Sequence, residues 1–491
     1  MLTQSITRPI TRPITRYITS GYEGSYYGAS IVYGIKWDTT NSSSTVTKGV
    51  INNGAFVEQD YTDHPIQEQI KRVLRKADAS SKKYLDADDS TKLSDGSAAT
   101  LDGSDGDVQA EIPRHYQLWV RDGDTQYILI GDGRFKFLGV EAWMPLCFRG
   151  RRYYYFDAFE GVLYDDDAGS LIDGQDSTPE AADKTNDICR SLPGYKPWVY
   201  EERGQYRQLF ANRGGETHQQ MWNAHQMIVA LFVTEYGDWD SQSELPGYTD
   251  AGSWDYAKVR KTGRTMSLGN VSGSVQVDFS GDDSDLKPSV AGGGSDWVES
   301  TTTPGEYYYD GDLVPTEPVK MLRSGVEMTN GTLGSLNNDE WAWGDQDSIG
   351  EDRPYVKVSE GDPDSLSADT IEAQLVSDTQ IVANSYRGIE NIFGHIWGFL
   401  DGINIDNTSG DCHVYTCTTP DDFADDTATN YVDTGHTPAF GDDDGYIVDI
   451  LGAGKHCPLY PDDITGGSSS TYLCDYHYNN SGAWRVLMVP P

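Results

Sequence analysis

Carboxylates are the side chains in this sequence that could bind a metal ion, and three of them are consecutive at Asp442, Asp443 and Asp444. Carboxylate oxygens are the ligands that Ca²⁺ prefers, so these three aspartates are the metal candidates. The chain nevertheless lacks the alternating Asp-x-Asp-x-Asp-Gly spacing of a helix–loop–helix calcium site. We therefore expect no cofactor, and calcium is the one ion that these aspartates would take.

Motifs that carry catalysis are absent from the sequence. It has no phosphate-binding loop, no Gly-x-Ser-x-Gly elbow, no His-Glu-x-x-His pair and no dinucleotide fingerprint. His225 lies in an apolar helical pattern with no nucleophile beside it, which indicates a core or boundary histidine. A carboxylate pair acting on a glycoside depends on distance in the folded chain and stays open. We expect no catalytic residues and no enzymatic activity.

Cysteines are few and widely spaced in this chain. No two of them form a Cys-x-x-Cys pair or a zinc-like Cys/His cluster, so free, buried thiols are expected. The six are Cys147, Cys189, Cys412, Cys417, Cys457 and Cys474.

A polar-aromatic cluster near the end of the chain is the strongest candidate for ligand binding. Tyrosine, histidine, asparagine and aspartate give large contact area and adaptable hydrogen bonds at low entropic cost. The alternative is an ordinary tyrosine-rich strand packed on its domain. The candidate residues are Tyr472, Asp475, Tyr476, His477, Tyr478, Asn479, Asn480 and Trp484.

The first residues form a short basic repeat in an otherwise acidic chain. Residues 5–16 repeat Ile-Thr-Arg-Pro, and the prolines favour an extended segment over a helix. Arg8, Arg12 and Arg16 make this segment a candidate arm for attachment to a partner protein. The alternative is a frayed terminus.

Three stretches have helical periodicity. In residues 386–405 the apolar side chains recur at three- and four-residue steps, which predicts a helix ending at Asp401-Gly402 and a following strand at 403–405. Arg387 and Glu390 are expected to form an ion pair or a cap at the start of this helix. Residues 214–237 predict a second helix capped by Thr217. Residues 65–77 predict a short helix with a solvated basic face.

The remaining regular pattern is β, and the predicted fold class is α+β and β-rich. Strands are expected at 30–37, 115–120, 126–130, 134–140, 152–156, 305–309, 445–451 and 484–489, with hairpin turns at Asp122-Gly123 and Asp132-Gly133. Changes in composition divide the chain into an arm (1–20), a small β-rich and helical region (21–78), an acidic Ser/Asp/Gly linker (79–111), one domain in two pieces (112–274 and 382–491) and an inserted acidic, loop-rich β module (275–381).

The charge balance limits the partners of the surface. The 491 residues include 77 acidic and 37 basic side chains, a formal charge of -40. Such a surface repels polyanions, so nucleic acid and anionic membranes are not expected as partners. No apolar run is long enough to span a bilayer or to act as a signal peptide, which predicts a soluble protein without membrane insertion.

An ordered series of segments resembles the C-type-lectin-like domains of bacteriophage tail-fibre tips and of diversity-generating-retroelement variable proteins, a fold shared with formylglycine-generating enzymes. The series spans residues 112–274 and 382–491. It comprises 194–197, 213–215, 234–237, Ser241-Gln242, Gly263-Arg264, 268–270, 385–391, Trp397, Asp401-Gly402, 466–470 and 484–486.

The resemblance implies two helices flanking a small, irregular antiparallel sheet, with the ligand surface in the C-terminal segment, here 472–480. It implies a virion protein on a tail or capsid surface, assembled in the host cytoplasm, that binds a host cell-surface glycan or protein. Other virion proteins would hold its arm, and the chain would form a homo-oligomer, namely a trimer. The alternatives are a capsid-decorating or tail-assembly protein, and an enzyme of the formylglycine-generating or glycan-cleaving kind. For the enzyme, no cysteine pair stands in a matching context.

Overall fold

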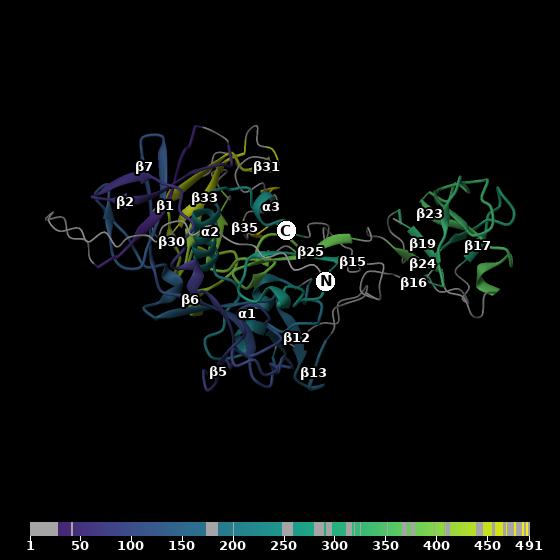
Figure 1. Ribbon diagram of the computed structural model, residues 1–491, viewed down its shortest axis with the longest axis horizontal. Coiled ribbons are helices and arrows are strands. Elements are labelled where there is room, and N and C mark those ends of the chain that lie inside the picture. Colours follow the sequence, from purple (N-terminus) through teal and green to yellow (C-terminus); the bar gives the residue numbers. More distant parts are fainter. Residues whose placement is uncertain are drawn as a thin grey trace.

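Short strands, nearly all antiparallel, form most of the regular structure, which confirms the predicted β-rich α+β class. The described part of this computed structural model has three α-helices (Figure 1). The description covers residues 28–489 except 41–42, 173–184, 200, 248–258, 279–288, 291–296, 311–316, 319, 325, 351, 366–370, 375–378, 397, 407, 409–412, 438–444, 454–456, 465–467, 469–475, 478–483 and 486–487.

A five-stranded sheet near the N-terminus confirms three of the predicted strands. Its order is β3-β2-β1-β8-β7, and Asp122 pairs with Thr125 across the two-residue turn of the β7–β8 hairpin. Gly123 lies in that turn at φ 61°, a conformation that favours glycine. Asp132-Gly133 closes no hairpin, since the strands on either side of it do not pair. The strands are β1 (Val32–Asp38), β2 (Thr47–Asn52), β3 (Ala55–Glu58), β7 (Tyr116–Asp122) and β8 (Thr125–Gly131), and β9 (Lys136–Phe137) pairs separately with β10 (Val140–Glu141).

Gly34 lies where the backbones of β1 and β8 approach closely. A Cβ atom added there would lie 1.9 Å from the carbonyl oxygen of Ile128 on β8. We expect Gly34→Ala to lower the free energy of unfolding by about 1 to 3 kcal/mol, because the strands must separate to admit the methyl group. Urea denaturation measures the change, and Gly273→Ala is the control, since its Cβ would meet nothing closer than 3.7 Å. Equal stability of the two variants would contradict the prediction.

A second sheet corrects the interpretation of residues 65–111. Its order is β11-β6-β4-β5, from β4 (Lys71–Arg75), β5 (Lys82–Tyr84), β6 (Asp107–Pro113) and β11 (Tyr153–Asp157). The helix predicted for 65–77 is wrong, because only the 3₁₀ turn η1 (Gln67–Gln69) precedes β4. Arg72 is fully buried there instead of solvated, and its guanidinium donates to Gly388 O and Thr265 O. Tertiary hydrogen bonds therefore override the helical periodicity.

The stretch predicted as a linker is folded onto this sheet. Residues 79–111 contain β5, and the Leu85 side chain in this stretch is buried. The aspartates accept hydrogen bonds from backbone N–H groups two residues further on, as Asp95 does from Ser97 and Asp102 from Ser104. Such Asx turns order a Ser/Asp/Gly-rich segment that has little to bury.

The predicted helix over 386–405 is also wrong. The chain there forms β26 (Ile389–Glu390), β27 (Gly398–Phe399) and β28 (Ile403–Asp406), of which β28 confirms the predicted strand. Five residues have left-handed φ angles that an α-helix excludes. They are Arg387, Gly388, Asn391, Gly394 and His395. The apolar residues Ile389, Ile392 and Phe393 are buried all the same.

The expected Arg387–Glu390 pair does not form, because each side chain has another partner. Arg387 donates to Glu235 at the end of the second helix. Glu390 accepts from Gly263 N and Thr265 N, both at 2.7 Å. The loop conformation at 387–391 directs the two side chains to different parts of the molecule.

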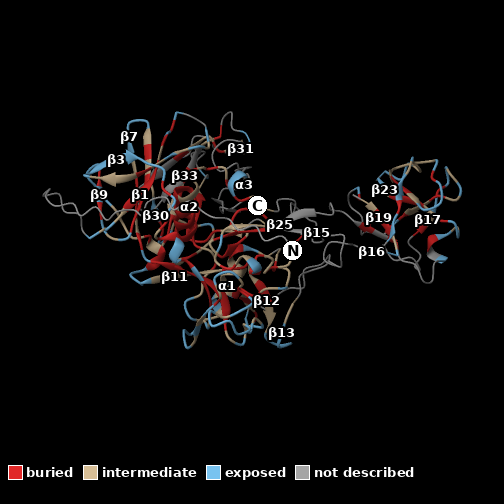
Figure 2. Cartoon of the chain, viewed as in Figure 1, coloured by how far each residue is buried: buried red, intermediate tan, exposed pale blue. Residues whose placement is uncertain are grey.

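The helix α2 (Trp222–Tyr236) confirms the second prediction and runs through the main core. Thirteen of its fifteen residues are buried, as Figure 2 shows in red. The helix ends at Gly237, whose φ is 78°, as expected. It begins only after Met221, so Thr217 is not its cap. The Thr217 hydroxyl donates instead to Gly214 O. The other helices are α1 (Arg203–Asn212) and α3 (Ser241–Glu244), and α1 packs on a sheet of β12 (Val162–Asp165), β13 (Ser170–Leu171) and β14 (Ile188–Arg190).

The insertion predicted at 275–381 coincides with a separate group of strands. β15 (Gly273–Asp278) and β25 (Thr379–Tyr386) pair with each other, and the strands between them lie apart from the main body in Figure 1. A core of its own includes Trp297, Met321, Trp341 and Val356. Its two sheets contain β16 (Ser289–Val290), β24 (Ile371–Gln374), β19 (Lys320–Arg323) and β20 (Val326–Glu327), and β17 (Trp297–Glu299), β18 (Tyr307–Tyr309), β23 (Arg353–Lys357), β22 (Glu340–Gly344) and β21 (Thr329–Asn330).

The C-terminal part returns to the main body as short paired strands. β28 pairs with β29 (His413–Thr416) and β35 (Trp484–Arg485), and β29 with β30 (Val432–Asp433). The remaining pairs are β27 with β36 (Met488–Val489), β31 (Gly445–Tyr446) with β34 (Tyr476–His477), and β32 (Asp449–Ala453) with β33 (Cys457–Asp463).

Candidate functional site

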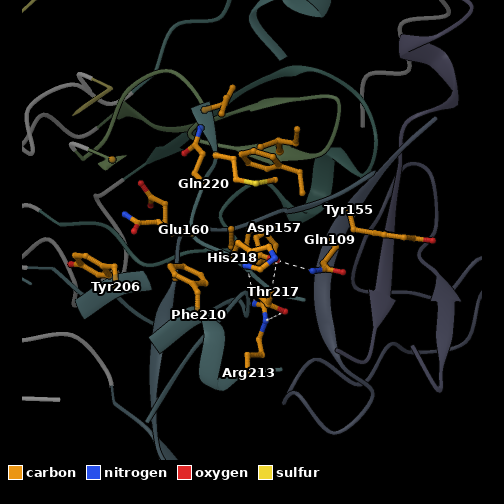
Figure 3. A pocket seen from close by; sticks show the side chains of 18 of the residues that line it. Gln109, Tyr155, Asp157, Glu160, Tyr206, Phe210, Arg213, Thr217, His218 and Gln220 are labelled. Atoms are coloured by element: carbon orange, nitrogen blue, oxygen red, sulfur yellow. Dashed lines mark hydrogen bonds and ion pairs between the residues drawn. The ribbon is translucent and has the colours of Figure 1, made fainter. Parts of the chain in front are cut away.

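A pocket of about 880 Å³ lies where β11, α1, the loop before α2 and the segment 389–399 meet (Figure 3). Arg149, Arg151 and Glu216 line it and are exposed, so the pocket opens to the surface. A volume of this size holds a ligand of a few hundred daltons.

One wall of the pocket is aromatic. Tyr206 and Phe210 stand one turn apart on α1, so they project from the same face of the helix (Figure 3). The Phe399 ring of β27 lies with its centroid 6.1 Å from that of Tyr206. All three rings are only partly buried, which leaves apolar surface available inside the pocket.

An ion pair holds the base of the pocket. Arg213, just after α1, donates to both oxygens of Asp157 at the end of β11, at 2.8 and 2.9 Å. Burial opposes the charge of Arg213, but the carboxylates of Asp157 and Asp107 outweigh it and raise its pKa. Gln109 of β6 donates its amide N–H to Asp157 Oδ1 at 2.8 Å. These bonds connect α1 to the sheet that carries β11.

Three buried polar atoms on the pocket lining have no hydrogen-bond partner among the described residues: Gln109 Oε1, His218 Nε2 and Gln219 Oε1. The amide of Gln219 is oriented by its N–H donation to Phe399 O at 3.2 Å. Burial and the nearby Arg149 charge lower the pKa of His218, so its imidazole is neutral at pH 7. Buried polar groups of native proteins are normally paired, so these three atoms are exceptions, and each has almost no surface exposed to the pocket.

The residues predicted for ligand binding do not line this pocket. Tyr476 and His477 form β34, whose backbone pairs with β31, and Trp484 begins β35 opposite Asp406 of β28. The other predicted ligand-binding residues, the arm residues Arg8, Arg12 and Arg16, and the metal candidates Asp442, Asp443 and Asp444 lie outside the described residues. Those assignments stay predictions.

The pocket was missed from the sequence because its lining comes from segments between Arg75 and Phe399 that are distant along the chain. A local signal did exist at residues 149–156, where arginines precede the run Tyr153-Tyr154-Tyr155-Phe156. We interpreted that run only as a strand, β11.

Cys147, Cys189 and Cys417 are free and buried. Burial raises the pKa of each thiol, so all three are protonated at pH 7 and are weak nucleophiles. Across the described ranges no group of three His, Cys, Asp or Glu side chains is arranged to hold a metal ion. The helices of the described part are each too short or too polar to cross a membrane.

Comparison of the chain with models of known protein families, with curated proteins and with solved structures finds no match.

Proposed function

We propose that this chain is a phage virion protein of the tail fibre or tail tip, which binds a host cell-surface glycan or protein through a C-type-lectin-like domain. Its partners on the particle would be other virion proteins held through residues 1–20, and a trimer is the proposed assembly. The observation that carries the proposal is that segments of the resemblance, although far apart in sequence, contact one another in the fold.

Two contacts, one partly buried and one buried, join those segments. Glu235, in the segment 234–237, accepts from Arg387 and from the Tyr386 hydroxyl. Glu390, in the segment 385–391, accepts from Gly263 N and from Thr265 N and Oγ1. A set of matching residues that merely occurred by chance would have no reason to contact one another in the fold, so the two contacts support a shared architecture.

The predicted ligand surface is connected to this architecture through backbone pairing. β34 joins β31, and β35 joins β28, which follows directly on the segment 385–402. A recognition segment needs such a framework, because binding residues are positioned most effectively on rigid elements. The high acidic charge would also disfavour adhesion to anionic surfaces in general, leaving specific contacts to select the receptor.

Replacing Tyr476 and Tyr478 by alanine tests the proposed receptor surface. We expect at least about a tenfold loss of binding to host cells, because hot-spot residues, among which tyrosine is enriched, cost about 2 kcal/mol or more when truncated. Flow cytometry with labelled protein measures the binding, and circular dichroism reports the fold. Tyr84→Ala, a partly exposed tyrosine of β5, is the matched control and should bind normally. Normal binding by the double variant would place the receptor site elsewhere.

A deletion separates the C-terminal surface from the inserted module. Asp278 and Thr379 pair directly across β15 and β25, so a short glycine-rich turn can replace residues 279–378. Retained cell binding would support the C-terminal site, whereas lost binding with the fold intact would assign recognition to the module. Antibody labelling of 472–480 on intact particles then distinguishes an adhesin, which exposes this segment, from an assembly protein, which buries it.

A further inference from the structure

We infer that the open side of the sheet β11-β6-β4-β5 is a docking surface for a glutamate- and aspartate-rich segment of a partner protein. This docking surface is separate from residues 472–480, and binding there requires neither a host cell nor a virion. The surface, named the basic face, consists of Lys71, Arg75, Lys82, Tyr84, Glu111, Tyr153 and Tyr155 of the four strands and Arg152 just before β11.

The strand register places these side chains on one side of the sheet. Tyr155 of β11 and Lys71 of β4 each lie directly opposite Glu111 of β6. Arg75 of β4 lies opposite Lys82 of β5. Directly paired residues of neighbouring strands share a face, and so do residues two apart in one strand. The four strands therefore present one continuous face.

The other side of the sheet packs into the core and leaves the basic face open. Ala110 and Ile112 of β6 point to that other side and are fully buried in the main core. On the basic face, Lys71 and Arg152 are exposed, and Tyr84 is 37% exposed. A partner protein can therefore reach the charged ends of these side chains.

Cations outnumber carboxylates on the basic face. Lys71, Arg75 and Arg152 contact tyrosine rings and have no carboxylate partner in the described part of the chain. Glu111, at the centre of the face, already accepts from Lys82. Three positive charges are thus left without a negative charge beside them.

Two further carboxylates on this side of the sheet are also paired. Asp107 accepts from Arg190, and Asp157 accepts from Arg213. They are therefore not available to the three cations of the basic face. In a chain with a formal charge of -40, such a face is a local exception, and it complements an acidic partner.

Tyrosine rings hold the cations in place. The guanidinium carbon of Arg75 lies 4.4 Å from the centroid of the Tyr155 ring, and that of Arg152 lies 5.2 Å from the Tyr153 centroid. Lys82 Nζ lies 4.7 to 5.9 Å from the centroids of all three tyrosine rings of the face. Such contacts restrict long side chains before binding, so less rotamer entropy is lost when a partner docks.

The same contacts favour a polypeptide over a single-stranded nucleic acid. Each of the three rings already has two cations over it, so a stacking base would compete with them. A carboxylate, in contrast, bonds the cations directly and leaves the rings where they are. A nucleic acid also extends beyond the face and is repelled by the rest of this acidic chain, whereas a short acidic segment contacts the face alone.

Binding of labelled probes to the full-length protein tests the inference. The probe is a peptide of alternating glutamate and glycine, and the comparators are the same peptide with glutamine for glutamate and an oligothymidylate of equal charge. We expect the glutamate peptide to bind with a Kd on the order of 0.1 mM at low salt, at least about tenfold more tightly than either comparator. Fluorescence anisotropy measures the affinities, and about 0.3 M NaCl should weaken binding about tenfold, because the contacts join exposed charges.

A charge-matched pair of variants locates the peptide. Lys71→Gln with Arg152→Gln removes two cations of the basic face and should weaken binding about fivefold or more. Arg134→Gln with Lys136→Gln is the control, because it removes the same charge from exposed positions outside this sheet and should change binding less than about twofold. In the wild-type protein, the peptide should also protect Lys71 from acetylation and leave Lys136 reactive, which mass spectrometry measures.

Three results would overturn the inference. They are no binding of the glutamate peptide, tighter binding of the oligothymidylate, which would assign the face to single-stranded nucleic acid, and equal losses in the two double variants. Replacing Tyr476 and Tyr478 should weaken cell binding and leave peptide binding intact, so this inference and the proposed receptor surface can fail independently.

Discussion

Replacing Asp401 by alanine is expected to lower the free energy of unfolding by about 3 kcal/mol, because it leaves the partly buried Arg207 without one of its two carboxylate partners. Asp401 is fully buried and accepts from Arg207 Nε at 2.6 Å and Nη2 at 2.8 Å. Burial opposes the Arg207 charge, but its hydrogen bonds to Asp401 outweigh this and raise its pKa. The pair fastens the segment after β27 to α1.

Asp401 belongs to a larger, partly buried network. Arg207 also donates to Asp425 Oδ1 at 2.8 Å, and Arg203 donates to the same oxygen at 2.6 Å. Arg203 further donates to Ile403 O and to Asn404 Oδ1 of β28. Loss of Asp401 would thus weaken the attachment of β28 as well as one ion pair.

Urea denaturation with a double-mutant cycle measures this effect. Arg207→Ala combined with Asp401→Ala should cost less than the two single changes added together, because neither charge is then left alone. Glu58→Ala is the control, since its pair with Lys36 is at the surface and should contribute no more than about 0.5 kcal/mol. If the losses of unfolding free energy in the two single variants simply add up in the double variant, Arg207 and Asp401 do not stabilise each other.

Lowering the pH from 6.5 to 4 is expected to destabilise the protein through two buried histidines. Burial lowers the pKa of both His115 and His225 to about 4. In the unfolded chain both take up protons below about pH 6.5, whereas in the folded protein they stay neutral until about pH 4. Proton uptake therefore favours unfolding across this window, at a cost of about 3 kcal/mol for each histidine.

The histidine contribution is isolated by comparing urea midpoints at pH 7 and pH 4.5. His115→Phe and His225→Phe should each remove roughly half of the difference, because phenylalanine binds no proton and fits the aromatic surroundings, Phe148 beside His115 and Trp222 beside His225. The same acid destabilisation in both variants would assign it to other groups.

Local patterns predicted those elements in which every signal agreed. The β7–β8 hairpin has alternating apolar residues and Gly123 at its turn, and α2 has a wide apolar face that ends at Gly237. Both follow from interactions within a few residues, so sequence alone is sufficient for them. The inserted strands were likewise visible as a change in composition between β15 and β25.

Helical periodicity failed where distant partners decided the backbone. Residues 389–400 have the spacing of an amphipathic helix, yet left-handed residues such as Arg387 and Asn391 break it, and their neighbours bond to residues more than 100 positions away. The Arg72 side chain was expected in solvent, but it is buried and donates to the carbonyl oxygens of Thr265 and Gly388. A periodic apolar pattern predicts which residues are buried, but it does not determine the backbone conformation in which they are buried.

The sequence by itself determined the β-rich class, the central helix α2, the hairpin turn at Gly123 and the acidic charge, because each depends on residue type and short-range spacing. Only the tertiary structure decided the pocket and the Asp401 network. Gln109, Arg213 and Phe399 line one cavity although they lie about 100 to 290 residues apart, and no local pattern encodes such proximity. It arises when separate segments bury their apolar faces together and pair the polar groups left between them.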